Sequence, residues 1–245
     1  MAAAIANGLL AALLPCNCVL CGASGPALLC PGCHRQFFAA AVPRCPICAN
    51  PLPPAPQATQ AVPCGRCQAE HPAFDATVVA ADYALPVDRL VLQLKFARQL
   101  ALARLFAGLL ADAVQRADAG LQPRPALLCP VPLGLQRLSE RGFNQALEIA
   151  RPLGKTLGIA VHGKLAVRVR DTQAQSSTPH GARHANIAHA FAIPERALVE
   201  GRHIGVVDDV MSSGQTLQEL AATLKRYGAA RVTNYVFART PPNPN

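Results

Sequence analysis

In residues 76–245, short apolar runs, which predict strands, alternate with longer segments whose apolar residues recur every three or four positions, which predict helices. Strands are expected at residues 76–83, 125–132, 202–210 and 231–238. Helices are expected at Val87–Phe96, Leu100–Ala117, Gly142–Leu157 and Gly214–Tyr227. Pro152 lacks a backbone N–H, so we expect the third helix to kink or end near Ala150. The alternation favours an α/β fold with a parallel sheet, whose binding residues lie where strands end.

Residues 1–75 have a different pattern, because nine of the ten cysteines fall between Cys16 and Cys67. Eight of them form four Cys-x-x-Cys pairs: Cys18/Cys21, Cys30/Cys33, Cys45/Cys48 and Cys64/Cys67. Two residues between cysteines let both thiolates reach one ion, and two such pairs complete the tetrahedral shell that Zn²⁺ prefers. Pairing in sequence order predicts two structural zinc sites, which replace the core that so small a module cannot build. We therefore divide the chain into a zinc-ribbon module at residues 1–75 and a larger domain at residues 76–245.

The two predicted zinc sites differ in the spacing of their pairs. Eight residues separate the pairs of the first site and fifteen those of the second, which is the ordinary ribbon spacing. Disulfides are the main alternative, but a reducing compartment and the paired spacing argue against them, and a thioredoxin-like motif needs a single pair. Cys16 and His34 lie close enough in sequence to replace a ligand, although a bystander role is the simpler interpretation. Cys129, alone in an apolar run, is expected to be a buried strand residue.

The composition indicates a folded, basic protein. Apolar residues make up 51% of the chain and charged residues 15%, which excludes a mostly disordered protein. The net charge is +9, and the excess lies in residues 76–245, which hold 20 basic and 12 acidic residues. Such a domain attracts phosphate groups, whether they belong to a small ligand or to a nucleic acid.

The N-terminal segment Met1–Leu14 is apolar, but it carries no basic residue and is too short to cross a bilayer. We expect it to form a short helix that packs its leucines on the rest of the protein. No other stretch reaches the length of a membrane span, so we expect a cytoplasmic protein.

The segment His203–Leu217 combines the features of a ribose-phosphate site. An apolar strand ends in two carboxylates, Asp208 and Asp209, which can accept hydrogen bonds from vicinal ribose hydroxyls. The following loop opens a helix and consists of Ser212, Ser213, Gly214, Gln215 and Thr216. Backbone N–H groups at a helix start can cradle a phosphate, and the loop hydroxyls add donors. The acid pair and the loop are spaced like the 2,3-diol and the 5-phosphate of one ribose.

This segment resembles the phosphoribosyl diphosphate (PRPP) signature of type I phosphoribosyltransferases. The resemblance implies a Rossmann-like parallel sheet, PRPP bound together with Mg²⁺, and displacement of pyrophosphate at ribose C1. Residues 137–183 hold eight basic and three acidic residues, which supply cations for the leaving pyrophosphate. A solvated helix face is the alternative interpretation for several of them. We take Asp208, Asp209 and Arg141 as the candidate catalytic residues.

Further segments resemble the competence protein ComF family over nearly the whole chain. They are Cys129–Leu133, Arg137–Ala146, Arg170–Gln175, Arg183–Ile187 with Phe191, and Tyr83–Phe96, together with the four cysteine pairs. The resemblance implies a link to natural transformation. It places Arg141, Gly142, Asn144 and Gln145 in a hood loop at the active site, and it places Thr172, Gln175, Arg183 and Asn186 nearby.

One position departs from the purine-salvage relatives, which carry an acidic residue in the phosphate loop as a base for the incoming purine. Ser212 stands at the matching position here, which argues against a purine acceptor. An acceptor that is already deprotonated stays open, and so does a base from elsewhere, such as His180 or His184.

Two functions from different classes fit this sequence. The first is a PRPP-dependent transferase with an unknown acceptor. The second is a non-catalytic accessory of DNA uptake that binds single-stranded DNA or competence proteins and keeps the PRPP pocket as a sensor or relic. Both acids and all loop hydroxyls are present, which favours catalysis, and an aromatic content of 4% weakens the case for base stacking.

Overall fold

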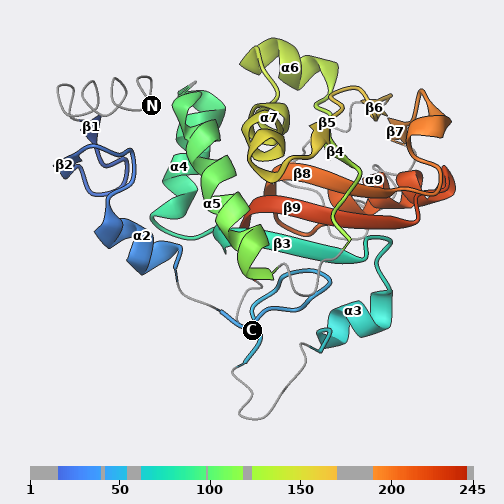
Figure 1. The fold of residues 1–245 in the computed structure, drawn as a ribbon, viewed down its shortest axis with the longest axis horizontal. Helices are drawn as coiled ribbons and strands as arrows, with labels where there is room; N and C mark the ends of the chain where they lie inside the picture. Colours follow the sequence, from blue (N-terminus) through green and yellow to red (C-terminus); the bar gives the residue numbers. More distant parts are fainter. Residues whose placement is uncertain are drawn as a thin grey trace.

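The computed structural model describes residues 16–39, 42–53, 62–97, 99–117, 123–169 and 190–241 (Figure 1). The helix expected at Met1–Leu14 lies outside these ranges. Within them, no helix is long and apolar enough to cross a membrane.

A parallel sheet of five strands forms the centre of the fold, in the order β3-β9-β8-β4-β5. The strands are β3 (Ala76–Asp82), β4 (Leu127–Pro130), β5 (Ala160–Val161), β8 (His203–Met211) and β9 (Arg231–Arg239). The middle strand is β8, which pairs Asp208 with Val236 of β9 and Val206 with Cys129 of β4. Because the strands are parallel, their carboxyl ends share one edge, and β8 brings its two acids to the centre of that edge. The Rossmann-like sheet expected from the sequence is confirmed.

Helices cover both faces of the sheet. They are α4 (Val87–Phe96), α5 (Ala101–Ala117), α6 (Leu135–Arg141), α7 (Gln145–Leu157) and α9 (Gln215–Arg226). On one face, α4, α5 and α7 share a core with Val207 and Phe237. On the other face, α9 shares a second core with Val206 and Val236. Val206 and Val207 belong to different cores because successive strand side chains point to opposite faces.

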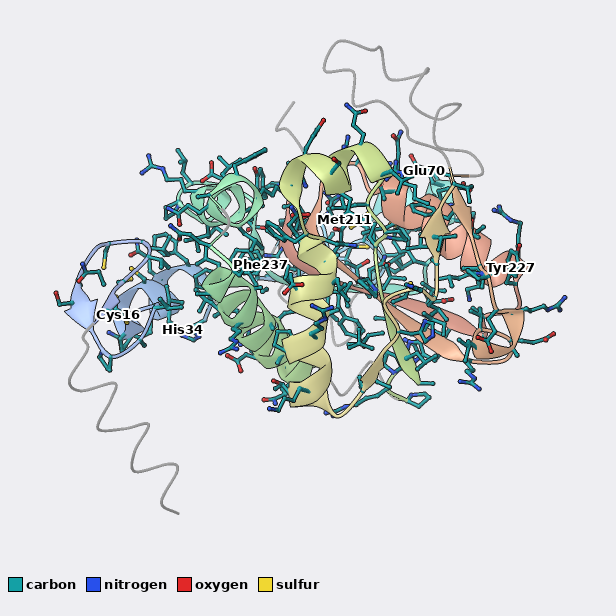
Figure 2. All side chains as sticks on the ribbon, turned by 90° about the horizontal axis from the view of Figure 1, so that it is seen from above. Cys16, His34, Glu70, Met211, Tyr227 and Phe237 are labelled. Atoms are coloured by element: carbon teal, nitrogen blue, oxygen red, sulfur yellow. The ribbon has the colours of Figure 1, made fainter. Side chains whose placement is uncertain are left out.

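The cysteine-rich part forms two small units. The first ribbon, residues 16–39, contains β1 (Cys16–Asn17), β2 (Ser24–Gly25) and α2 (Pro31–Phe37), and the second ribbon, residues 42–53 and 62–70, contains α3 (Gly65–Glu70). Phe38 of the first ribbon joins the core beneath α5, and Figure 2 shows Phe237 in that interior, with Cys16 and His34 out on the ribbon.

The second ribbon joins the core beneath α9 through Cys45, Cys48 and Cys67. It also satisfies a backbone donor of the edge strand β3, because the Thr77 N–H donates to the Pro46 carbonyl at 3.2 Å. The two ribbons therefore pack on opposite faces of the sheet near its β3 edge, and one of them caps that edge.

In residues 76–245, the sequence prediction missed the shortest elements. These are α6, β5, the antiparallel pair β6 (Val167–Arg168) and β7 (Phe191–Ala192), and the 3₁₀ turn η2 (Arg196–Leu198). The helix expected from Gly142 begins instead at Gln145, because Gly142 ends α6 with a φ of 78° and Asn144 caps α7.

Of the two outcomes expected at Pro152, a kink or an end near Ala150, the end is wrong, since α7 continues through Pro152 to Leu157, and the kink stays a prediction. Pro152 removes one backbone donor, but the turns beyond it bury Leu153, Gly154 and Leu157. Burial of this apolar face against α5 and the sheet outweighs the loss of one hydrogen bond.

Gly154 provides a test of the packing between α7 and β5. A Cβ at this position would lie 2.5 Å from Val161 Cγ2 and 2.6 Å from the Ile159 carbonyl oxygen. We expect Gly154→Ala to lower the free energy of unfolding by about 1–3 kcal/mol in urea denaturation, because a backbone atom blocks the new methyl group. Gly108→Ala in α5 is the matched control, since a Cβ there has no atom within 4 Å, and it should stabilise the helix slightly. Equal effects of the two changes would contradict this packing.

Candidate functional site

Two adjacent carboxylates stand at the carboxyl end of β8. Asp209 is 7% exposed, and its Oδ2 forms an ion pair with Lys95 Nζ at 3.0 Å. Since Lys95 belongs to the last turn of α4, Asp209 faces the α4 side of the sheet. Asp208 is half-buried, and its Oδ1 accepts a hydrogen bond from the Asp209 N–H at 2.9 Å. The two-residue period of the strand turns Asp208 toward the α9 side.

The surroundings of Asp208 favour its protonated form. Burial and the repulsion from Asp209 raise the pKa of Asp208 from 3.8 to about 8, although the Asp209 N–H and Lys95 act in the opposite direction. Hydrogen-bond donors or positive charge supplied by a ligand would favour the ionised form. At the acid pair, a polyhydroxylated or metal-bound ligand would therefore relieve the electrostatic repulsion.

The loop after β8 enters α9 through a position that requires glycine. Gly214 has a φ of 82°, and a Cβ there would lie 2.6 Å from Met211 Cε. Within the described residues no side chain caps α9, and the Gln215 N–H has only a 3.5 Å contact with Ser213 Oγ. The first N–H groups of α9, and the hydroxyls of Ser212, Ser213 and Thr216 beside them in sequence, are available to an anion.

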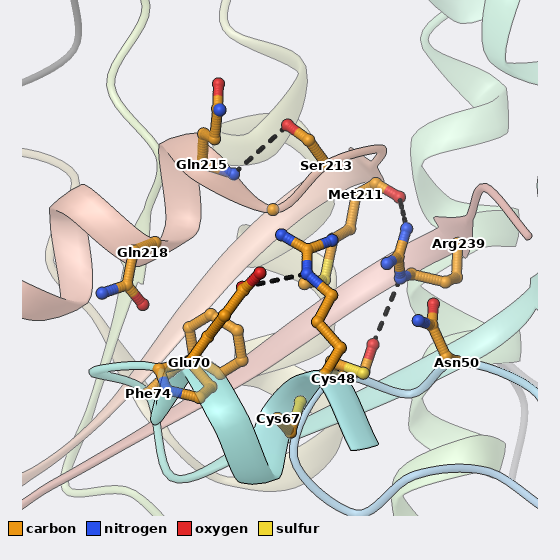
Figure 3. A pocket seen from close by; sticks show the side chains of 13 residues that line it. Cys48, Asn50, Cys67, Glu70, Phe74, Met211, Ser213, Gln215, Gln218 and Arg239 are labelled. Atoms are coloured by element: carbon orange, nitrogen blue, oxygen red, sulfur yellow. Dashed lines mark hydrogen bonds and ion pairs between the residues drawn. The ribbon is translucent and has the colours of Figure 1, made fainter. Parts of the chain in front are cut away.

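Arg239, at the end of β9, holds the same loop by its backbone carbonyls (Figure 3). It is 3% exposed, and its Nη1 donates to the carbonyls of Met211 at 2.9 Å, Ser212, and Thr240 at 2.8 Å. Its Nε donates to the carbonyl of Cys48 in the second ribbon at 3.2 Å. The sequence analysis missed this residue, for which the one available signal was an arginine directly after the apolar run at residues 235–238.

The joint between α6 and α7 brings four predicted hood residues to this edge of the sheet. The Asn144 side chain donates to the backbone carbonyl of Val131, just after β4, at 3.0 Å. Arg141 Nη1 donates to Gln145 Oε1 at 3.2 Å, and the Arg141 guanidinium lies 5.5 Å from the centre of the Phe96 ring. Phe96 directly follows Lys95, which forms the ion pair with Asp209. The end of α4 therefore links the hood residue Arg141 to the acid pair. That lysine lies in the Tyr83–Phe96 stretch that resembles the ComF family, but it was not predicted as a site residue.

The hood residues Arg141, Gly142, Asn144 and Gln145 differ in exposure. Gln145 is 2% exposed, and its Nε2 has no hydrogen-bond partner among the described residues. Gly142 is exposed, and Arg141 is half-buried. Gln145 is therefore fixed in the fold, whereas Arg141 and Gly142 have surface that a ligand can reach.

The remaining hood predictions lie outside the described part of the chain. They are Thr172, Gln175, Arg183 and Asn186, together with the candidate bases His180 and His184. The strands β6 and β7 flank this segment, and the Arg168 guanidinium lies 5.6 Å from the centre of the Phe191 ring. The six positions stay predictions.

The eight paired cysteines form two four-sulfur clusters, grouped as sequence order predicts: Cys18, Cys21, Cys30 and Cys33, and Cys45, Cys48, Cys64 and Cys67. In each cluster the sulfur atoms lie within 4.8 Å of one another. The Sγ atoms of Cys21 and Cys30 are 3.7 Å apart, and those of Cys48 and Cys64 are 3.6 Å apart. A tetrahedron with Zn–S bonds of about 2.3 Å has edges of about 3.8 Å, so both clusters fit Zn²⁺.

The two clusters are built alike. In each, the third cysteine is the N-cap of a short helix, Cys30 for α2 and Cys64 for α3. Its N–H donates to the sulfur of the first cysteine, Cys18 at 3.4 Å or Cys45 at 3.3 Å. All ten cysteines are free rather than disulfide-bonded.

Three further residues were considered as possible ligands or reactive groups. Cys16 and His34 belong to neither cluster, and Cys16 Sγ lies 3.4 Å from the Gly25 carbonyl oxygen. Cys129 is fully buried in β4, which confirms its expected place, and burial raises the pKa of its thiol to about 12. A thiol in this environment is inert.

Comparison with known proteins agrees with both halves of the chain. Residues 9–68 match the double zinc ribbon domain family, and residues 139–243 match the phosphoribosyl transferase domain family. The chain is thus a double zinc ribbon followed by a phosphoribosyl transferase domain.

Relatives match most of the chain. DNA utilization protein YhgH of Salmonella typhimurium is 37% identical over 198 residues, which cover 80% of this chain and 84% of that protein. Competence protein F of Haemophilus influenzae is 30% identical over 213 residues, 86% of this chain and 90% of that protein. The chain therefore belongs to the competence protein F (ComF) family.

Solved structures match more distantly. The purine phosphoribosyltransferase of Pyrococcus horikoshii aligns over 67% of this chain and 87% of its own, at 16% identity and a TM-score of 0.33. A score this low adds nothing to the assignment made from the family models and the relatives.

Metal analysis tests the two clusters. We expect two zinc ions per chain, and one after either Cys30→Ser/Cys33→Ser or Cys64→Ser/Cys67→Ser, because each pair removes half of one tetrahedral shell. Elemental analysis of the purified protein measures the stoichiometry. A single ion in the wild type, lost with one variant and kept with the other, would restrict zinc to one cluster.

The raised pKa of Asp208 predicts how stability depends on pH. A carboxyl whose pKa is higher in the folded than in the unfolded state destabilises the fold increasingly as pH rises from about 4 to about 8. We expect Asp208→Asn to remove this loss, so that urea denaturation shows the variant more stable than wild type at pH 8, with a difference about half as large at pH 6. Asp112→Asn, at an exposed carboxylate of α5, is the control. A gain for Asp208→Asn that does not change with pH would contradict the shift.

Proposed function

We propose that this protein binds PRPP with Mg²⁺ and transfers its ribose 5-phosphate to an acceptor, with release of pyrophosphate. The observation that carries the proposal is the arrangement at the end of β8, where an acid pair precedes an uncapped helix N-terminus entered through Gly214. Membership in the ComF family supports it through the phosphoribosyl transferase domain.

Each part of this edge has a task in that reaction. Asp208 forms no ion pair among the described residues and faces the α9 side, so it accepts hydrogen bonds from the ribose hydroxyls. The carboxylate of Asp209 is held in place beside Asp208 by its ion pair with Lys95 at 3.0 Å. The loop Ser212, Ser213, Gly214, Gln215 and Thr216 receives the 5-phosphate through N–H and hydroxyl donors.

The chemistry at C1 breaks the bond between ribose and pyrophosphate and forms one to the acceptor. Positive charge develops on the ribose and negative charge on the leaving pyrophosphate, so cations near the latter accelerate the step. Arg141, whose guanidinium lies over the exposed Phe96 ring at the mouth of this edge, is the described candidate for that cation. Mg²⁺, bound with PRPP, would neutralise part of the diphosphate charge.

The acceptor is not a purine of the salvage type in this proposal. The loop position that would carry the base is Ser212, and its carbonyl accepts a hydrogen bond from Arg239. A serine hydroxyl is a poor base at neutral pH. The acceptor must be deprotonated already or use a base from elsewhere in the chain, such as His180 or His184.

The zinc ribbons are structural in this proposal. Residues 1–75 would form the zinc module and residues 76–245 the transferase domain, in the reducing cytoplasm that keeps eight thiols free for metal. Removal of the metal would then act on the fold and not on the chemical step directly.

A second candidate is a single-stranded-DNA accessory of DNA uptake, in which the PRPP pocket is a sensor or relic. The names of the relatives, DNA utilization protein and competence protein, favour it. So does an open groove of about 1020 Å³ between α5 and α7, lined by Arg104, Arg151 and Lys155 among others. Glu148 pairs with Arg151 at 2.8 Å, which leaves Arg104 and Lys155 to meet a phosphate backbone.

One pair of assays separates the two candidates. We expect Asp208→Ala/Asp209→Ala to lower PRPP- and Mg²⁺-dependent pyrophosphate release at least about 100-fold, since the ribose loses both acceptors. Pyrophosphate is followed across candidate acceptors, and binding of single-stranded DNA is measured at two salt concentrations. Asp112→Ala, at an exposed helix position, is the control and should keep the activity.

The two functions are not mutually exclusive, because a protein can bind DNA and also transfer ribose phosphate, so the two assays measure them separately. Salt-dependent DNA binding that is indifferent to the double variant, without PRPP-dependent pyrophosphate release by the wild type, would support the accessory role and refute the transferase. Pyrophosphate release that survives the double variant would also refute the proposed site.

A further inference from the structure

A direct structural link joins the second cysteine cluster to the phosphate loop. Arg239 donates from Nε to the carbonyl of Cys48, a member of that cluster, and from Nη1 to the carbonyl of Met211 (Figure 3). Nη1 also donates to the carbonyl of Ser212, where the loop begins. One buried guanidinium therefore bonds at one end to the Cys45–Cys48 turn, which we call the knuckle, and at the other end to the loop.

The knuckle is also bonded to the end of β3, next to the end of β9 that carries Arg239. The Arg44 guanidinium, which precedes it, donates to the Ala49 carbonyl at 3.1 Å and pairs with Asp82 of β3 at 2.8 Å. Asp82 is the register partner of Arg239 across β3 and β9. The turn that presents the Cys48 carbonyl is thus fixed by the cluster at its cysteines and by two arginines at its backbone.

The charge of Arg239 also points to the cluster. Among the described residues Arg239 has no carboxylate partner, although it is 3% exposed, and an unpaired buried cation is costly. Four thiolates outweigh the two positive charges of Zn²⁺, so a filled Cys45–Cys67 site is anionic and lies next to the guanidinium. A filled cluster compensates the burial of Arg239, and an empty one removes that compensation.

A cavity separates the ribbon from the loop, and among the described residues Arg239 makes the only side-chain hydrogen bonds that join them. The cavity measures about 310 Å³, and its lining includes Arg66 and Glu70 of α3 and Ser213 and Gln215 of the loop. Arg66 pairs with Glu70 at 2.9 Å rather than with the loop. Movement of the knuckle therefore reaches the loop mainly through Arg239.

We propose that Arg239 is a positioning residue through which the metal-filled second cluster orders the phosphate loop, so that loss of metal from this cluster weakens PRPP binding. The inference rests on the proposed function for its ligand. The guanidinium is needed because its rigid fork reaches carbonyls in two directions, which a single ammonium nitrogen cannot do.

The first cluster supplies a matched control. Its third and fourth cysteines have the same burial classes and the same helix-start position as those of the second cluster, but its ribbon packs beneath α5, on the other face of the sheet. We expect Cys64→Ser/Cys67→Ser to weaken PRPP–Mg²⁺ binding about tenfold or more in calorimetry, and Cys30→Ser/Cys33→Ser to change it less than about twofold. Equal weakening by both pairs, or by neither, would overturn the proposal.

Hydrogen exchange of the ligand-free protein tests the link without PRPP. Peptides that cover residues 211–217 should exchange faster in Cys64→Ser/Cys67→Ser and in Arg239→Lys than in wild type, while Arg239→Lys keeps its full zinc content. If Arg239 had only a general structural role, Arg239→Lys would lower the melting temperature and leave both loop exchange and the PRPP dissociation constant unchanged. Unchanged exchange in both variants would refute the coupling, whereas failure of wild type to bind PRPP would refute the proposed function alone.

Discussion

The burial of two neighbouring carboxylates at the end of the middle strand is the constraint on which this site depends. A parallel strand between two others is dry on both faces, so an acid at its end meets little water and strong repulsion from a neighbouring acid. On one face of the sheet, Lys95 of α4 supplies a cation that forms an ion pair with Asp209. Asp208 is left on the other face with its pKa raised to about 8, and this side faces the phosphate loop.

The edge strand β3 explains where the cysteine module attaches to the sheet. An exposed edge strand such as β3 presents unpaired backbone groups, and the second ribbon covers part of that edge through the Pro46 carbonyl. The two ribbons add their buried cysteines to the two cores on either face of the sheet. Zinc binding and packing of the sheet are therefore coupled, although the clusters lie far from the acids in sequence.

Local sequence patterns were sufficient to predict the helices and strands that arise from long periodic segments. The helix Val87–Phe96 was predicted with its observed bounds, and the acid pair and Gly214 were found because their types and order are unusual. Pro152 misled the prediction, because a rule about one residue could not anticipate the buried face that continues beyond it. Lys95 and Arg239 were missed as site residues, since a basic residue at the end of a helix or strand is ordinary in sequence.

The sequence by itself determined the class of fold, the grouping of cysteines into two clusters and the segment that offers acids and phosphate donors. These properties depend on residue type and short spacing, which act locally. Only the tertiary structure decided that Lys95 faces Asp209, that Asp208 looks to the opposite face, and that Arg239 joins the Cys48 carbonyl to the loop at Ser212. Such contacts connect residues up to 191 positions apart, and they arise when strand order and helix packing bring distant side chains to one edge.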